Sequence, residues 1–205
     1  MALISIAEID ANEQRAYGGR LRTKTASEIL QEDTVKYPLT FQFDIFLSHS
    51  YSDVQISRDR LLGLKAILED LNYTVYVDWL IDTTLDRERV TDSTAMVLRT
   101  RMSHSRSLLF ATSANSQNSK WMPWELGFKD GQSAVGGSLG TVAILPLATY
   151  SGSHGFEGQE YLGVYPYIDK SNNKGGIPKL WVHEDEETYV QFDDWLSGKK
   201  PFKRT

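Results

Sequence analysis

The stretch FDIFLSHSYSD, residues 43–53, decides the fold of this 205-residue chain. Its first part, residues 43–48, is a mostly apolar run, which is typical of a central strand buried on both faces of a sheet. The polar residues 48–53 then form a loop with several side chains that can cap a helix. Leucine recurs at helical spacing between residues 61 and 71. The sequence therefore predicts a strand, a loop and an amphipathic helix in succession.

The same alternation of strand and helix continues along the chain. Apolar and β-branched runs predict further strands at 74–77, 107–111, 141–145 and 180–182. Helices are expected between them and at 189–196. The predicted fold class is therefore α/β, a doubly wound parallel sheet of five strands with helices on both faces.

Two segments do not fit this pattern. Residues 1–40 are polar, with few recurrent apolar positions, and we expect a short N-terminal helical extension that packs loosely on a domain at 41–205. Residues 150–178 are rich in Gly, Tyr and Asn and predict an irregular insertion before the last strand.

The composition limits the chemistry that is available. The chain has no cysteine, which excludes disulfides, thiol nucleophiles and cysteine zinc sites. Its formal charge of −5 disfavours nucleic acid as a partner. Its longest apolar stretch is far short of the roughly 20 residues that span a bilayer, and its first ten residues do not form a signal peptide. We therefore expect a cytoplasmic protein without a membrane or nucleic-acid partner.

In a doubly wound sheet, a ligand binds beyond the carboxyl ends of the strands. This rule selects the loops 48–53, 78–82 and 111–125. The third loop is the most unusual, because Trp121 and Glu125 lie four residues apart and would share one face of a helix, with Trp124 between them. An aromatic ring beside a carboxylate can hold a flat cationic ring. The alternative is that both tryptophans belong to the core and that Glu125 is a charge favoured by the helix dipole.

Three segments of the chain resemble, in the same order, the boxes of the Toll/interleukin-1 receptor/resistance (TIR) family. They are FDIFLSHSYSD (43–53), LKAILEDLNYTVYVD (64–78) and SRSLLFATSANSQNSKWMPWELGF (105–128). The resemblance covers about residues 41–182, and the chain is similar to bacterial TIR proteins of anti-phage, Thoeris-like systems. It implies the flavodoxin-like TIR fold. Residues 78–90 depart from the family because they lack its common Arg-Asp-x-x-Pro-Gly pattern.

TIR domains are either non-catalytic adaptors or enzymes that cleave NAD, and the resemblance implies roles for two residues. Glu125 matches the catalytic glutamate of the enzymes, and Trp121 matches the aromatic residue that lines their nicotinamide site. The chemistry agrees, because NAD already carries a cationic leaving group and one carboxylate can suffice to stabilise the ribosyl cation. NAD would be the substrate, and no cofactor or metal is expected.

The other candidate residues would surround this pair. Three residues of the first loop could receive the diphosphate of NAD, together with the start of the following helix: Ser48, His49 and Ser50. A hydrogen-bonded His49 without a catalytic role is an alternative. Asp78 would contact the nucleotide, with a loop-capping role equally open, and Trp79 and Trp124 would form an aromatic rim together with Trp121.

The preferred hypothesis is a TIR NAD glycohydrolase/cyclase of bacterial antiviral defence. It would release nicotinamide and a cyclic or otherwise non-linear ADP-ribose signalling product that acts on a partner effector, with linear ADP-ribose as the alternative product if water captures the ribosyl cation. Self-association would raise its activity. Two alternatives stay open. One is a non-catalytic TIR module that signals by assembly, and the other is a nucleoside deoxyribosyltransferase-like enzyme. Incubation with NAD and with deoxynucleosides separates the three.

Overall fold

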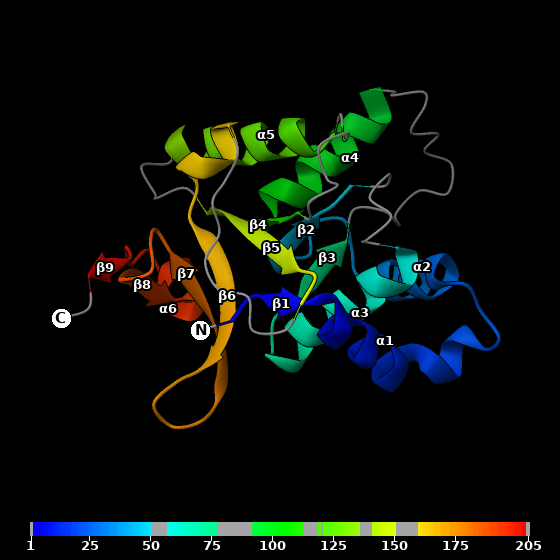
Figure 1. The fold of residues 1–205 in the computed structure, drawn as a ribbon. Helices are drawn as coiled ribbons and strands as arrows, with labels where there is room; N and C mark the ends of the chain where they lie inside the picture. The colour runs from blue at the N-terminus through cyan, green and yellow to red at the C-terminus, as the bar shows by residue number, and fades with distance from the viewer. Residues whose placement is uncertain are drawn as a thin grey trace.

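The computed structural model describes residues 2–50, 57–77, 92–112, 119, 121–135, 141–150 and 160–203, which form a sheet with helices on both faces (Figure 1). Among these residues, five parallel strands have the spatial order β3 (Val75–Val77), β2 (Phe43–Ser48), β4 (Ser105–Thr112), β5 (Val142–Ala148) and β6 (Tyr167–Asn172). The predicted fold class is confirmed.

Strand β2 lies inside the sheet, as its apolar sequence predicts. It pairs with β3 on one side and with β4 on the other, and five of its six residues are buried. Its last residue, Ser48, is in register with Phe110 of β4. Because parallel strands end at the same edge of a sheet, this is the edge at which a ligand is expected.

Helices cover both faces of the sheet. One face carries α1 (Ile6–Leu21), α2 (Ala26–Val35), α3 (Arg58–Asp70) and α6 (Phe192–Leu196), and the other carries α4 (Asp92–Ser103) and α5 (Met122–Val135), which lie above the sheet in Figure 1. Ile45 and Leu47 of β2 belong to the hydrophobic cluster of the first face, whereas Phe46 belongs to that of the second. Within the described residues, none of these helices has the length and apolar character needed to cross a membrane.

The described side chains of β1, α1 and α2 include several that are buried in the core, so the expectation of loosely packed helices is wrong. Strand β1 (Ile4–Ser5) pairs with the end of β5, and Ile9 and Tyr17 of α1 are buried in the cluster shared with α3. The two helices meet at Gly63, where a Cβ atom would collide with the Ile9 carbonyl oxygen. Because glycine has no side chain, two helices can approach closely at this position. Such a contact leaves no apolar pattern in the sequence that would predict it. The boundary at residue 40 stays a prediction.

The C-terminal part differs from the prediction in the identity of the fifth strand. That strand is β6, inside the segment 150–178 that was expected to be irregular. The predicted strand 180–182 belongs to β7 (Pro178–His183), which is antiparallel to β6. Only residues 173–177 connect the two strands, whereas a parallel crossover needs about a dozen residues or more.

Two further strands extend this antiparallel edge, β8 (Thr188–Gln191) and β9 (Phe202–Lys203). The helix predicted at 189–196 is therefore shorter than expected and occupies only Phe192–Leu196. Its predicted first residues pair with β7 instead.

Candidate active site

Glu125 lies in the first turn of α5, and the residues around this turn favour the start of a helix. The hydroxyl of Ser119 accepts a hydrogen bond from the Met122 amide at 3.2 Å, and Pro123 occupies the first turn, where its missing N–H costs nothing. The Glu125 amide donates to the Trp121 carbonyl at 2.9 Å. The positive end of the helix dipole thus lies close to the Glu125 carboxylate and favours its negative charge.

Ser48 and Glu125 form a buried pair between the sheet and this helix. The Ser48 hydroxyl donates to Oε2 of Glu125 at 2.5 Å, across 77 residues of sequence. Neither side chain is exposed to solvent. The structure thus brings together two of the predicted site residues, at the carboxyl end of β2. A role of Ser48 as a diphosphate ligand stays a prediction.

His49 and Ser50 continue the chain directly beyond β2. Both are buried, with exposed fractions of 1% and 0%. They lie at the same edge of the sheet as Ser48, as the strand order predicts. Their contact with a diphosphate also stays a prediction. Asp78 and Trp79 lie outside the described residues, so their predicted contacts with NAD stay predictions.

The two tryptophans differ in their surroundings. Trp121 precedes α5 and is half-buried, with its ring 5.4 Å from that of Trp124 in an edge-to-face arrangement. Trp124 also stacks on Phe128 at 6.0 Å and lies under the Arg99 guanidinium at 5.6 Å. These contacts place Trp124 between α4 and α5, and both tryptophans pack against the hydrophobic cluster of this face. Their contact with NAD stays a prediction.

Lys129 is a residue that the sequence analysis missed. Its ammonium group is buried and donates to the carbonyls of Met102 at 2.9 Å and Ser105 at 2.5 Å, where α4 ends and β4 begins. Burial lowers the pKa of this ammonium group to about 8. Lys129 follows Glu125 by four residues, and this spacing was the available signal that it shares the inward face of α5. It anchors the helix that carries Glu125.

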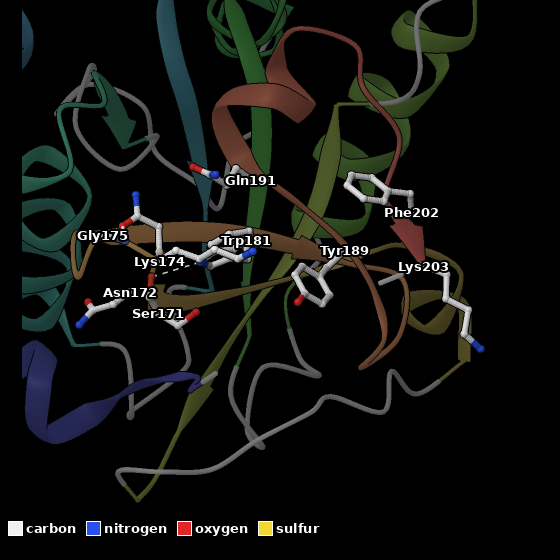
Figure 2. A pocket seen from close by; sticks show the side chains of 10 residues that line it. Ser171, Asn172, Lys174, Gly175, Trp181, Tyr189, Gln191, Phe202 and Lys203 are labelled. Atoms are coloured by element: carbon white, nitrogen blue, oxygen red, sulfur yellow. Dashed lines mark hydrogen bonds between the residues drawn. The ribbon is translucent and has the colours of Figure 1, made fainter. Parts of the chain in front are cut away.

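A groove of about 990 Å³ lies elsewhere, on the antiparallel strands β6 to β9 (Figure 2). Its lining includes the aromatic side chains of Trp181 and Tyr189 and the basic side chains of Lys174 and Lys203. It shares no lining residue with the candidate active site. Among the described residues, no group of three or more histidine or carboxylate side chains could hold a metal ion.

The fold is a doubly wound sheet, and Glu125 of a Trp-x-x-x-Glu segment is buried against the end of a central strand. This is the arrangement of a bacterial TIR protein. No protein-family model matches the chain. The chain is similar to a protein of Bacillus cereus (strain MSX-D12) that is described as a probable 3' cyclic ADP-D-ribose synthase, ThsB'. The two sequences are 43% identical over 174 residues, which are 84% of this chain and 85% of that protein. The chain belongs to the family of this relative, the Thoeris-type TIR proteins.

A second relative matches a smaller part. A protein of Cytobacillus dafuensis, whose description proposes a cyclic ADP-D-ribose synthase, TIR2, is 33% identical over 87 residues. These residues are 42% of this chain and 22% of that protein.

Proposed function

We propose that the chain cleaves NAD into nicotinamide and a cyclic ADP-ribose product, with Glu125 as the catalytic carboxylate. The observation that carries this proposal is the buried Glu125 beside Ser48 at the carboxyl edge of the sheet. The descriptions of both relatives, which name a cyclic ADP-D-ribose synthase, support the same reaction.

In the proposed reaction, the bond between the ribose and the nicotinamide nitrogen breaks and its electron pair stays with that nitrogen. Nicotinamide leaves as a neutral molecule, so no acid has to protonate it. The positive charge moves to the ribose, where a preorganised carboxylate stabilises it most strongly in the transition state. Trp121, half-buried just before α5, would stack on nicotinamide and orient it. NAD is the substrate, and this mechanism uses neither a metal nor another cofactor.

The ribosyl cation must then be captured. Water would give linear ADP-ribose, whereas a nucleophilic atom of the same molecule forms the new bond to the ribose, releases a proton and closes a ring. Exclusion of water favours ring closure, and the aromatic side chains of Trp79, Trp121 and Trp124 would contribute to that exclusion. The product would serve as a diffusible messenger for a partner effector in cytoplasmic antiviral defence, and self-association of the chain would raise its activity.

The test is nicotinamide release from NAD by the wild-type chain and by Glu125→Gln, which is nearly isosteric but uncharged. We expect the variant to lose about 10²- to 10³-fold in turnover, because the charge stabilises the transition state. Asp130→Asn is a matched control, since it removes another carboxylate of the same helix. That carboxylate accepts a hydrogen bond from the Tyr165 hydroxyl at 3.1 Å. A folded Glu125→Gln protein with most of the wild-type turnover would contradict the assignment.

Mass spectrometry of the same reaction tests the product. A species one water lighter than ADP-ribose supports ring closure. If ADP-ribose is the only product, the chain is an NAD hydrolase and not a cyclase. No nicotinamide release at any protein concentration would favour a non-catalytic assembly module instead.

A further inference from the structure

The Ser48 hydroxyl is held in place by the sheet. Ser48 ends a strand that pairs on both sides, with Leu47 in register with Val77 and Ser48 itself in register with Phe110. The side chain has no exposed area. The backbone that carries the hydroxyl is therefore fixed by two neighbouring strands.

The Glu125 carboxylate is attached to a second fixed element. Helix α5 is anchored to the end of α4 by Lys129 and by Gln132, whose amide donates to the Ser103 hydroxyl at 2.8 Å. A glutamate side chain still has three torsions between its backbone and its carboxylate. The hydrogen bond from Ser48 to Oε2 links the sheet to the end of this flexible side chain.

We infer that Ser48 is a positioning residue, whose hydroxyl fixes the orientation of the Glu125 carboxylate and favours its ionised form for cleavage of NAD. This inference rests on the proposed function. The 2.5 Å separation of the two oxygens lies in the range of hydrogen bonds from a hydroxyl to a charged carboxylate. Such a bond favours the ionised form, whereas burial opposes it. A neutral carboxyl group could not stabilise the ribosyl cation.

The first test removes the hydroxyl in Ser48→Ala. We expect kcat to fall about 10- to 100-fold, the usual effect of losing a hydrogen bond to a charged group, with a smaller change in KM. The pH at which kcat falls on the acid side should rise by about 1 to 2 units, because burial now acts on the carboxylate without the hydroxyl. Ser48→Thr keeps the hydroxyl and should restore most of the wild-type kcat and the wild-type pH profile.

Ser107→Ala is a matched control on the neighbouring strand β4. Ser107 is also fully buried, and its hydroxyl donates to the Asp44 carbonyl at 2.7 Å. Its removal should lower the free energy of unfolding without moving the pH profile. Ser48→Cys, with a weaker donor of similar size, provides a second test if Ser48→Ala does not fold. The acid limb of its pH profile, which is the fall of kcat on the acid side, should lie at a higher pH than in the wild type.

Other charged groups must be separated from Glu125. On the described parts of β2, α4 and α5, these are Asp44, Asp92, Arg99, Arg101, Lys129 and Asp130, with His49 directly after Ser48. Asp44 lies near the start of β2, where it bonds to Thr74 and Arg106. Arginine stays charged throughout, and loss of the Lys129 charge would appear on the alkaline side. An acid limb that persists in His49→Asn and in Asp130→Asn, and that moves in Ser48→Ala, belongs to the Glu125 carboxylate, which the Ser48 hydroxyl contacts directly.

The outcomes distinguish the two proposals. If the wild-type chain releases no nicotinamide from NAD, the proposed function fails, and if Glu125→Gln retains turnover, the catalytic role of Glu125 fails. If Glu125→Gln is inactive but a folded Ser48→Ala protein keeps the wild-type kcat and pH profile, only the role of Ser48 is refuted. The same pH shift in Ser107→Ala, or no acid limb in His49→Asn, would also overturn that role.

Discussion

Gly63 offers a sharp test of how the N-terminal helices hold the fold. It lies in the middle of α3, where this helix contacts α1. A Cβ atom at this position would overlap the carbonyl oxygen of Ile9 and lie 3.0 Å from Cβ of Glu13. The atoms in conflict are backbone or close to it, so no side-chain rotation can relieve the collision. Gly63→Ala must therefore push α1 away from α3.

The magnitude follows from two opposing effects. Helix propensity alone predicts that Ala stabilises the middle of a helix by about 1 kcal/mol relative to Gly. Overpacking of a close contact costs about 1–3 kcal/mol, and a collision with backbone belongs at the upper end of this range. We expect a net loss of about 2 kcal/mol in the free energy of unfolding. For a chain of this length, the loss corresponds to a decrease in Tm of about 4–8 °C.

The assay is thermal and urea-induced unfolding of Gly63→Ala beside Gly131→Ala. Gly131 is also inside a helix, α5, but a Cβ atom there would meet nothing within 4 Å. Propensity should act alone at Gly131, so this variant should be more stable than the wild type by about 0.5–1 kcal/mol. A Gly63→Ala protein at least as stable as the wild type would refute the close contact between α1 and α3.

Two further predictions concern the site. In Lys129, burial lowers the pKa to about 8 from 10.5, so the unfolded chain binds more protons between these values and stability rises with pH there. Between pH 7 and 9.5, the free energy of unfolding of the wild type should therefore rise by about 2 kcal/mol more than that of Lys129→Met, and parallel curves would contradict this. Trp121→Ala should stay folded but show a higher KM and lower kcat, whereas Trp124→Ala, which loses packing against Phe128, should show the larger decrease in Tm. An unfolded Trp121→Ala protein would assign that ring to the core.

The sequence predicts the strands and helices whose signal is local. Residues 43–48 are mostly apolar, as suits a strand that is covered on both faces, and Pro123 suits the first turn of α5. Strand β6 escaped prediction because YIDKSN is largely polar. Strand β7 is antiparallel to it because only residues 173–177 connect the two strands. The bond between Ser48 and Glu125 escaped for a different reason. Each residue was a candidate, but their contact depends on where α5 packs over the end of β2.

The N-terminal helix shows most clearly why an apolar pattern alone is insufficient. The interface of α1 with α3 combines the buried side chains of Ile9 and Tyr17 with the contact at Gly63 and with charged pairs. In one such pair, Nε and Nη2 of Arg60 donate to Asp10 at 2.7 and 3.0 Å. Lys65 of α3 is nearly buried, and its ammonium lies 2.6 Å from Glu69 and 3.5 Å from the Tyr17 hydroxyl. Such polar contacts look like a solvated surface in the sequence. Helix α3 follows β2 in the chain, so the residues that seemed to be an extension contribute to fixing the unit that carries Ser48.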